Sequence, residues 1–369
     1  MKIAVLSSHT SSLFWFRLDM MKDFINLGHS VVALGPESEV KWSSAFSKNN
    51  IQYKQIYVKR NSVNLISDIK TIIDLYRFIK KDKPDKIFTY QAKTIIYGSM
   101  AAWANGVHEV YPLIAGLGSI IRGTGFLNSI LKTLMKIELK LAIRESKKVF
   151  FQNDDDKSIF IQNGLVPKTK AVTINGSGVN LTKFQPVLLP KEPVFLFIGR
   201  LIKDKGIVEY LRACQRIKLL YPKVKCLLVG PYDSNPSALK PKELKFFTDR
   251  SIVEYFGEID DVRPYIARCS TFILPSYHEG TPKTVLEAMA MGRSIITSDA
   301  PGCRETVIHG YNGFLVNVKD VSGLVAKMEI LISDPMLNKL MAERSLKLVR
   351  EKYDVKLINE AIIKTMNLV

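Results

Sequence analysis

The chain has 369 residues, enough for two domains, and its hydrophobic content of 47% is that of a globular rather than a disordered protein. With 53 Lys and Arg residues against 35 Asp and Glu residues, its net charge of +18 favours polyanions as partners, either nucleic acid or an anionic lipid surface. No apolar run reaches the roughly 18 residues that span a bilayer, and residues 1–6 resemble a strand rather than a signal peptide, so we expect a cytoplasmic protein.

Short apolar runs alternate with amphipathic segments through the first half of the chain. This pattern predicts an α/β domain with a parallel sheet and helices between the strands. Strands are predicted near residues 3–7, 30–34, 86–90, 109–114, 147–152 and 171–174. Three aspartates, residues 154–156, open one helix, and we interpret them as complements of the helix dipole rather than as a metal site.

Two loops of this half follow predicted strands, at the carboxyl edge where parallel sheets bind ligands. The first loop, residues 7–12, consists of small hydroxyl residues around His9. The second contains Gly116 and Gly118, where the missing side chains would let a ligand approach the backbone. Arg122 follows as a candidate phosphate contact.

Residues 120–148 combine large apolar side chains with basic ones. Lys132, Lys136, Lys140 and Arg144 recur every four residues and would lie along one side of a helix. A basic amphipathic helix is typical of a membrane-surface element and equally of a core helix with a solvated basic face. Its apolar residues would therefore either insert shallowly into lipid or pack on the core; they are Leu131, Leu134, Met135 and Leu139.

Residues 184–193 contain three prolines and no periodicity, which predicts a linker. Alternation then resumes, and strands are predicted near residues 194–198, 224–229, 252–255, 271–274, 294–297 and 314–316. The second half therefore predicts another Rossmann-like unit. We place the two domains at residues 1–185 and 186–353.

Cations gather after the predicted strand 194–198. The strand runs into Gly199 and Arg200, and Lys203, Lys205 and Gly206 follow. At the carboxyl edge of a doubly wound sheet, the Arg200 and Lys205 side chains would point toward the ligand crevice, where they would neutralise a diphosphate.

Residues 279–287, E-G-T-P-K-T-V-L-E, surround the start of a predicted helix. Thr281 is the expected N-cap, Pro282 the first helical residue, and Gly292 the residue just past the end. Gly280 would let the loop backbone approach a phosphate at the helix N-terminus, which attracts anions.

The same element places two carboxylates eight positions apart, Glu279 before the helix and Glu287 inside it. A carboxylate accepts hydrogen bonds from neighbouring hydroxyl groups, so each could hold a sugar. Together with the helix N-terminus, they predict a site for a diphosphate flanked by two sugars.

The four cysteines show no C-x-x-C spacing, and the five histidines form no metal-ligand pattern beside them. We therefore expect buried, reduced thiols, no metal site and no cofactor.

In combination, these motifs resemble the nucleotide-sugar half of retaining glycosyltransferases of family 4, which have the GT-B fold. The residues that carry the resemblance are Gly199-Arg200, Lys205-Gly206, Glu279 with Glu287, Pro301-Gly302, Glu305, Gly310 and residues 312–316. Residues 14–17, 116–118 and 149–153 are similar, more narrowly, to bacterial enzymes that extend polyprenyl-diphosphate-linked oligosaccharides for O-antigen, capsule or N-glycan assembly. Many family members have paired glycines where this chain has residues 7–12, which leaves the role of that loop open.

The resemblance implies an α/β protein with two Rossmann-like domains facing a central crevice, and a last helix, about 354–369, that returns to the first domain. The first domain would bind an acceptor, with candidate contacts His9, Arg17, Gly116, Gly118 and Arg122. The second would bind the donor through Gly199, Arg200, Lys205, Glu279, Gly280, Thr281, Pro282 and Glu287. Among these, Arg200, Lys205 and Glu279 are the candidate catalytic residues.

We therefore expect a retaining transferase that moves a hexose or N-acetylhexosamine, first of all N-acetylgalactosamine, from a UDP-linked donor to a polyprenyl-diphosphate-linked saccharide. It would bind the anionic inner face of the cell membrane peripherally. No side chain stands out as a nucleophile, so a front-face reaction is favoured, in which the leaving phosphate takes the acceptor proton.

Two alternatives remain open at this point. One is a nucleotide-sugar epimerase or hydrolase of GT-B architecture, which would act on the donor alone. The other is a basic nucleic-acid-binding protein, although the chain lacks the recognition motifs of that class, and we expect no nucleic acid partner.

Overall fold

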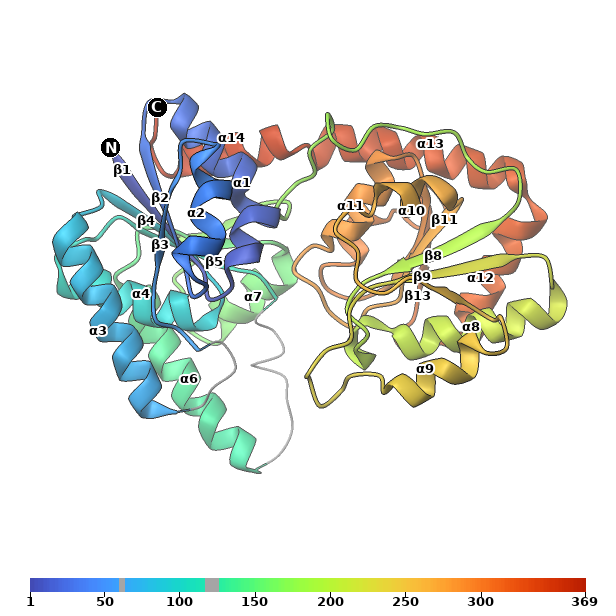
Figure 1. The fold of residues 1–369 in the computed structure, drawn as a ribbon, viewed down its shortest axis with the longest axis horizontal. Coiled ribbons are helices and arrows are strands. Elements are labelled where there is room, and N and C mark those ends of the chain that lie inside the picture. Colours follow the sequence, from blue (N-terminus) through green and yellow to red (C-terminus); the bar gives the residue numbers. More distant parts are fainter. Residues whose placement is uncertain (60–63, 117–125) are drawn as a thin grey trace. The chain divides into compact units, whose positions relative to one another are not determined.

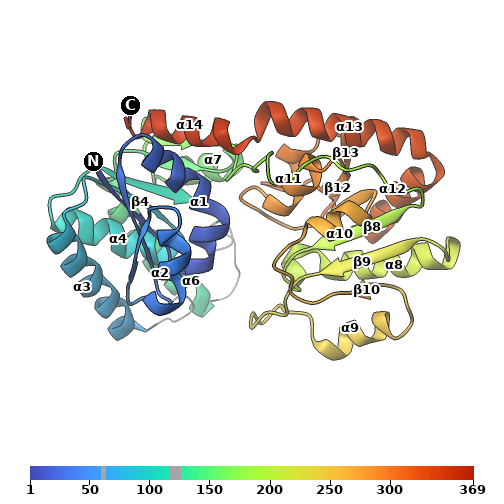
Figure 2. The same cartoon turned by 45° about the horizontal axis from the view of Figure 1, so that its top comes forward.

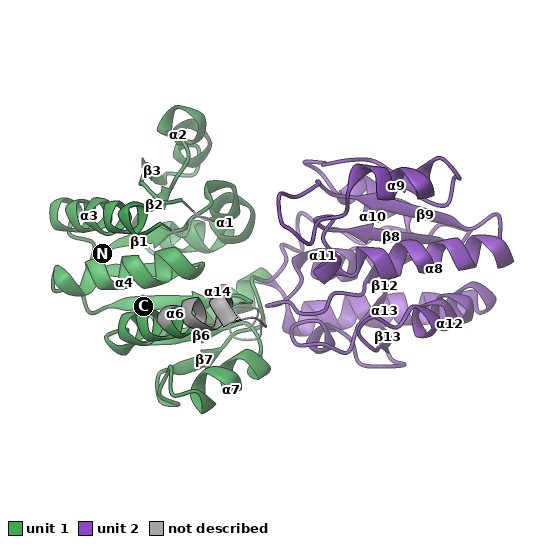
Figure 3. Cartoon of the chain, turned by 90° about the horizontal axis from the view of Figure 1, so that it is seen from below, with its two compact units in different colours: residues 1–177, 355–369 green, residues 178–354 purple. Residues whose placement is uncertain are grey.

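The computed structural model describes residues 1–59, 64–116 and 126–369, without the side chains of residues 126–132 and 134. The chain divides into two compact units, unit 1 with residues 1–177 and 355–369 and unit 2 with residues 178–354 (Figure 3). The division falls between residues 177 and 178, whereas the boundary predicted from the sequence lies after residue 185.

Unit 1 is built on a parallel sheet whose described strands follow the order β3-β2-β1-β4-β5-β6-β7. The strands are β1 (Lys2–Leu6), β2 (Ser30–Gly35), β3 (Gln52–Gln55), β4 (Lys86–Tyr90), β5 (Val110–Ile114), β6 (Val149–Phe151) and β7 (Ala171–Thr173). The central strands are apolar runs buried along most of their length, as expected when helices cover both faces of a sheet.

The helices of unit 1 cover both faces of this sheet (Figures 1 and 2). They are α1 (Thr10–Asn26), α2 (Glu39–Ser47), α3 (Leu65–Asp82), α4 (Ala92–Ala104), α6 (Phe126–Arg144), α7 (Asp154–Gln162) and α14 (Val355–Thr365). Right-handed crossovers put α1 and α2 on one face and α3, α4 and α6 on the other. The C-terminal helix α14 packs on α1, where Asn359 Nδ2 donates to Asp23 Oδ2 at 2.6 Å.

Unit 2 repeats this design with described strands in the order β10-β9-β8-β11-β12-β13. These are β8 (Val194–Ile198), β9 (Lys225–Val229), β10 (Glu254–Tyr255), β11 (Thr271–Leu274), β12 (Ser294–Ser298) and β13 (Gly313–Val316). Its helices are α8 (Ile207–Leu220), α9 (Pro241–Thr248), α10 (Arg263–Arg268), α11 (Lys283–Ala290), α12 (Val321–Ser333) and α13 (Pro335–Lys352), with short 3₁₀ turns at Lys203–Lys205 and Arg304–Thr306. The predicted pair of Rossmann-like domains is thereby confirmed.

All the predicted strands are present, with ends that differ by at most two residues. Strand β3 was not predicted, because Gln52–Gln55 is a polar segment in which Tyr53 is the one buried side chain. As an edge strand it pairs with β2 alone, so it needs only one inward apolar residue. The helix expected at the three aspartates is also present as α7, capped by the Asn153 side chain.

The predicted linker, residues 184–193, contains neither helix nor strand. It is nevertheless held on unit 2 by Arg293, whose guanidinium is fully buried. Arg293 donates to the carbonyl oxygens of Val187 at 3.0 Å and Ile266 at 2.9 Å. The segment therefore belongs to the packed surface of unit 2. Among the described helices, none is long and apolar enough to cross a membrane.

Candidate functional site

The candidate site of unit 2 lies at the point where the strand order of its sheet reverses. The chain leaves β8 toward β9 on one side and later enters β11 on the other side of β8. Open parallel sheets bind ligands beyond the carboxyl ends of the strands at such a point, because the two loops diverge there. Residues 199–206 after β8 and residues 275–282 after β11 therefore flank the site.

These two loops are fastened to each other. The carbonyl oxygen of Asp204 accepts hydrogen bonds from the Tyr277 amide at 2.9 Å and from Ser276 Oγ at 3.0 Å. Gly206 has φ 76°, and a Cβ atom at this residue would lie 2.1 Å from the carbonyl oxygen of Pro275. Only glycine fits this close approach, which fixes the position of Lys205 beside the second loop.

Lys205 and Glu279 form an ion pair at the centre of the site. Lys205 Nζ lies 2.5 and 2.6 Å from the two carboxylate oxygens of Glu279, and both side chains are mostly buried. The Glu279 amide donates to the carbonyl oxygen of Pro301 at 2.9 Å, and a Cβ atom on Gly302 would lie 2.2 Å from the carbonyl oxygen of Glu279. The Pro301-Gly302 turn after β12 thus holds the backbone that carries the carboxylate.

Helix α11 begins beside this ion pair, one residue later than predicted. Pro282 is the N-cap, with ψ 107°, rather than the first helical residue, and no side chain caps the helix. The predicted cap, Thr281, therefore lies one residue before the cap position, and Gly280 precedes it in the same loop. Gly292, with φ 73°, directly follows the C-cap as predicted. The first turn of α11 contributes the partial positive charge of a helix N-terminus.

Glu287 lies on the second turn of α11 and is 8% exposed. Burial raises the pKa of its carboxyl group to about 7, although Lys283 and Lys183 oppose this shift. A buried carboxyl group with such a pKa is poised to gain from hydrogen-bond donors that a ligand would bring.

Arg200 lies at the same loop edge and is held by Asp233, a residue that was not predicted from the sequence. Its Nη1 donates to Asp233 Oδ2 at 2.8 Å, and the guanidinium is about half exposed. Asp233 follows β9, so its position after the carboxyl end of a predicted strand could have indicated a site residue, but it belongs to no recognised motif. Gly199 precedes Arg200, and its carbonyl oxygen lies so close to Gly230 that a Cβ atom there would approach to 1.9 Å.

Two later motif residues, Asn312 and Glu305, make contacts that stabilise the fold of unit 2. Asn312 is buried, donates to the carbonyl oxygen of Thr306 at 3.1 Å and accepts from the Ile308 amide at 2.8 Å. It thereby closes the turn into β13. Glu305 lies in the short 3₁₀ turn of residues 304–306, where its carbonyl oxygen accepts from the Tyr353 hydroxyl group.

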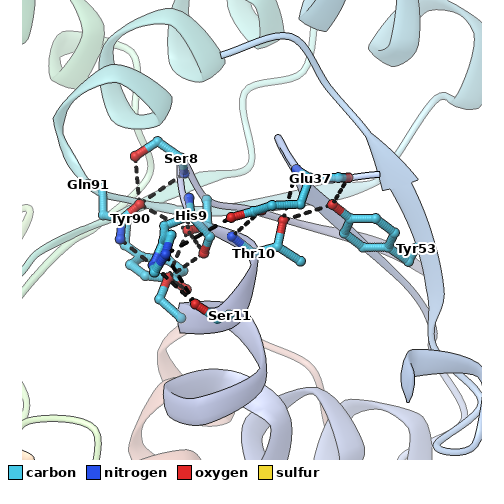
Figure 4. A network of polar contacts seen from close by, with 10 residues as sticks. Ser8, His9, Thr10, Ser11, Glu37, Tyr53, Tyr90 and Gln91 are labelled. Atoms are coloured by element: carbon cyan, nitrogen blue, oxygen red, sulfur yellow. Dashed lines mark hydrogen bonds and ion pairs between the residues drawn. The ribbon is translucent and has the colours of Figure 1, made fainter. Parts of the chain in front are cut away.

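A second candidate site lies in unit 1, where the strand order reverses between β1 and β4. Figure 4 shows the loop after β1 bound to Gln91, the first residue after β4. Gln91 Oε1 accepts hydrogen bonds from Ser7 Oγ at 2.9 Å, the Ser8 amide at 2.9 Å and Ser8 Oγ at 2.7 Å. Gln91 also has φ 73°, a strained value for a residue other than glycine. Gln91 was not predicted from the sequence, although it follows the carboxyl end of a strand.

His9 is the N-cap residue of α1, and its ring is about half exposed. The ring nitrogens lie 3.1 and 3.3 Å from Ser11 Oγ, and Nε2 lies 4.0 Å from Glu37 Oε1 (Figure 4). Glu37 also accepts from the Thr10 amide at 2.7 Å. The Ser11 hydroxyl group and the Glu37 carboxylate therefore position the His9 imidazole at the edge of the loop.

Arg17 is placed inside unit 1 rather than on a ligand-facing surface. Its side chain is 2% exposed, and the guanidinium stacks on the rings of Phe88 and Tyr90, at 5.7 and 5.2 Å from their centroids. Burial lowers the pKa of Arg17 to about 10. Gly116 follows β5 with φ 77°, as a close turn requires. Gly118 and Arg122 lie outside the described residues.

Among the described residues, no group of three or more His, Cys, Asp or Glu side chains is arranged to hold a metal ion. The polar groups described at the two sites include carboxylates, cations, hydroxyl groups and backbone amides, which suit an organic ligand with phosphate and hydroxyl groups.

Comparisons with known families match each half of the chain. A family model described as glycosyl transferases group 1 matches residues 192–334, and one described as glycosyl transferase 4-like matches residues 2–153. The chain is 27% identical to the N,N'-diacetylbacillosaminyl-diphospho-undecaprenol alpha-1,3-N-acetylgalactosaminyltransferase of Campylobacter jejuni, over 99% of this chain and 98% of that protein. It is 26% identical to the UDP-Gal:alpha-D-GlcNAc-diphosphoundecaprenol alpha-1,3-galactosyltransferase of Escherichia coli, over 75% of this chain and 74% of that one.

Solved structures share the fold of the whole chain. The sucrose-phosphate synthase of Thermosynechococcus elongatus superposes with a TM-score of 0.81 at 18% identity, over 99% of this chain and 98% of that one. The HepE protein of Anabaena, solved in complex with UDP and glucose, superposes with a TM-score of 0.79 at 17% identity and covers both chains fully.

Proposed function

The chain belongs to the GT-B glycosyltransferases that these two family models describe, and we propose that it transfers a hexose or N-acetylhexosamine from a UDP-linked donor to a polyprenyl-diphosphate-linked saccharide. The observation that carries this proposal is the Lys205–Glu279 ion pair at the strand-order reversal of unit 2, beside the N-terminus of α11. A cation, a carboxylate and a helix N-terminus in one place suit a sugar joined to a phosphate.

The donor would bind in unit 2 with its diphosphate near Lys205, Arg200 and the first turn of α11. As the bond between the sugar C1 and the phosphate oxygen breaks, negative charge grows on the departing diphosphate. Fixed cations and backbone amides stabilise this charge without reorganising, which is the largest contribution available to a site of this kind. Lys205 would then be shared between the phosphate and Glu279.

The two carboxylates would hold the two sugars of the donor. Glu279, whose carboxylate lies against Lys205, would accept hydrogen bonds from hydroxyl groups of the transferred sugar. Glu287 would accept them from the ribose, and ionisation of this buried group would be favoured by those donors. Gly199, Gly280, Thr281 and Pro282 would shape the loop backbone around the diphosphate.

We infer that the anomeric configuration of the sugar is retained. The names of both relatives specify alpha linkages in the product, and an alpha-linked donor would give such a product only with retention. In a front-face reaction the new bond between C1 and the acceptor oxygen forms on the side from which the diphosphate leaves. The leaving phosphate oxygen accepts the proton of the acceptor hydroxyl, so no separate base is required.

The acceptor would bind in unit 1, at the loop of residues 7–12. Relatives matched over 99% and 75% of this chain carry undecaprenol-linked diphosphosaccharides in their names, which supports an acceptor of this class. His9 would contact the acceptor from the loop edge, and Gly116 would let it approach the backbone. Because such an acceptor is anchored in the membrane, we propose that the enzyme works at the inner face of the cell membrane.

The test is a panel of UDP-sugars incubated with the purified chain and a synthetic lipid-diphosphate saccharide, with product masses as the readout. N-acetylgalactosamine is the expected sugar, because the relative matched over the full chain transfers it. A parallel incubation without acceptor separates the alternatives, since an epimerase or hydrolase would consume the donor alone. No transfer from any donor, together with tight binding to RNA or DNA, would refute the proposal.

A further inference from the structure

The outer face of helix α3 carries a row of exposed apolar side chains. Ser67, Thr71, Leu75 and Ile79 face the core at helical spacing. On the opposite side Ile66, Ile69 and Ile73 are 67%, 47% and 43% exposed. The solvent side of a surface helix is ordinarily polar, and exposed apolar residues are ordinarily scattered, so a row along one helix face indicates an interaction surface.

The charges on this face are positive. Lys70, Arg77 and Lys80 continue the same exposed side of α3, since they follow Ile66 at helical spacing. The acidic residues of α3, all of which the structure describes, are engaged on its flanks: Asp68 pairs with Lys93 at 2.5 Å, Asp74 accepts from the Tyr57 amide at 2.7 Å, and Asp82 pairs with Lys2. The apolar row therefore stands among cations.

The neighbouring helices extend the same face. Figures 1 and 3 show α3, α4 and α6 on one side of the unit 1 sheet, with α4 between the other two. Trp103 on α4 is 58% exposed, and Ile137 and Leu141 on α6 are each 52% exposed. A hollow of about 330 Å³ between α4 and α6 is lined by Trp103, Leu141, Arg144 and Glu145 among others, and Arg144 pairs there with Glu145 at 3.4 Å.

Burial decides between the two placements that the sequence left open for Leu139 and Met135, insertion into lipid or packing on the core. Leu139 is buried, and Met135 is partly buried, so neither lies on the outer surface of α6. Lys140 and Arg144 are exposed there, as a basic face requires. The side chains of Leu131, Lys132 and Leu134 lie outside the described residues, and Lys136 is partly buried.

We propose that the outer face of α3, continued by Trp103 of α4 and by Ile137 and Leu141 of α6, is the surface by which the enzyme binds an anionic lipid bilayer. Isoleucine and tryptophan side chains would enter the headgroup and upper acyl region, while the flanking Lys and Arg side chains would contact anionic headgroups. Charge complementarity selects a bilayer as the occupant, because the net charge of the chain is +18 and the cations border the apolar row. The inference rests on the proposed function only in that a membrane-anchored acceptor gives the contact its purpose.

The experiment is co-sedimentation of the full chain with sucrose-loaded vesicles of phosphatidylcholine, with and without phosphatidylglycerol. The apolar variant is Ile66→Ser/Ile69→Ser/Ile73→Ser, and the charge variant is Lys70→Glu/Arg77→Glu. Matched controls carry the same numbers of changes on exposed residues of unit 2: Leu219→Ser/Leu220→Ser/Met336→Ser and Lys242→Glu/Lys245→Glu.

We expect the wild type to bind phosphatidylglycerol vesicles and to dissociate at high salt, because exposed charges are screened. Each α3 variant should bind at least tenfold more weakly, and both controls should bind like the wild type. Unchanged binding by the α3 variants, or equal binding to pure phosphatidylcholine, would overturn the proposal. A wild-type dimer that the apolar variant converts to a monomer, with no change in vesicle binding, would assign this face to a second copy instead.

A water-soluble short-chain acceptor separates this inference from the proposed function. Transfer to that acceptor should be the same in the wild type and in the α3 variants, since none of the changed residues lies at either candidate site. If the wild type transferred no sugar to it, the proposed function would fail while the vesicle result still decided the membrane face.

Discussion

Lys205 is the side chain on which the proposed reaction depends most, because it is the cation held against Glu279 beside the α11 N-terminus. Lys205→Ala should lower kcat by about two orders of magnitude, the scale seen when a preorganised charge stabiliser is lost. Arg200→Ala should have a smaller effect, since Arg200 is more exposed and is already engaged by Asp233. Steady-state kinetics with saturating donor and acceptor measures both.

Lys203 supplies the matched control for these variants. It lies in the same short turn, two residues from Lys205, but its side chain is exposed and has no described ion-pair partner. Lys203→Ala should keep nearly full turnover. Equal losses in the Lys203 and Lys205 variants would mean that the turn contributes general positive charge rather than one positioned cation.

Glu287 should make UDP binding depend on pH. If its carboxylate accepts hydrogen bonds from the ribose, the free protein must ionise a group whose pKa burial raises to about 7. The affinity for UDP should then fall about tenfold for each pH unit below 7 and level off above pH 8. Isothermal titration from pH 5.5 to 8.5 measures this. The terminal phosphate of UDP titrates near pH 6 as well, so Glu287→Gln, which keeps only the ligand's own dependence, is the necessary comparison.

The same group should lower stability at high pH when no ligand is bound. Burial raises the pKa of Glu287 in the folded state from 4.5 to about 7. The contribution of this group to the free energy of unfolding is therefore complete below about pH 4.5 and is lost as the pH rises through 7. At pH 8 Glu287→Gln should therefore exceed the wild type in unfolding free energy by about 1–3 kcal/mol. Urea unfolding at pH 5 and pH 8 tests this, and a variant that is less stable than the wild type at pH 8 would show that the carboxylate has a favourable partner already.

The residues of the donor site could be predicted where they belong to a known motif and directly follow a predicted strand. Lys205 and Glu279 were predicted to face the same crevice, and the structure joins their side chains in an ion pair. Asp233 and Gln91 were missed, because their partners lie 33 and more than 80 residues away and no local pattern records such a contact. Arg17 was named as a candidate acceptor contact, yet its side chain is buried against the aromatic rings of β4.

The turn between β8 and α8 should be the least tolerant element of the site. Gly206→Ala would combine a positive φ with a Cβ atom 2.1 Å from the carbonyl oxygen of Pro275. Gly292→Ala has nearly the same φ, but nothing lies within 4 Å of its Cβ position. Left-handed strain of about 1 kcal/mol is common to both, so the clash should make the Gly206 variant about 1–3 kcal/mol less stable than the Gly292 variant. Denaturant unfolding gives the difference.

A loss of activity should accompany the Gly206 change only. The turn can relieve the clash by moving away from Pro275, and Lys205 would move with it. Gly292→Ala should retain turnover, since its turn lies at the far end of α11. If both variants were equally active and equally stable, the close packing of the two loops would not be needed to position Lys205.

Element boundaries were predictable where a local signal decides them. The apolar runs of β8 and β11 give their ends directly, whereas β3 is a polar edge strand that only its pairing with β2 defines. The start of α11 was placed one residue early. Proline is common at the first helical position, but Pro282 has ψ 107°, outside the helical range, and is therefore the N-cap.

Each unit has its own hydrophobic core, so the two should respond separately to a ligand that binds one of them. Unit 2 has one large core around β8, β11 and β12, and unit 1 has a core on each face of its sheet. The alternation of strands and helices predicted this two-unit organisation. The alternation did not locate the point, after residue 177, where the chain passes from unit 1 to unit 2. The proline-rich segment that was predicted as the linker lies further on and packs on unit 2 through Arg293.

Hydrogen exchange with and without UDP should reveal this separation. A ligand at 100 times its Kd stabilises its site by about 2.7 kcal/mol, which slows exchange wherever local opening breaks the site. We expect UDP to protect residues 199–206 and 279–290, the two loops and the helix that the Lys205–Glu279 pair joins. The amides of α3 and α4 in unit 1 should exchange at unchanged rates. Glu287→Gln should reduce the protection at matched UDP concentration, and protection that instead appeared in unit 1 alone would assign the nucleotide to the other site.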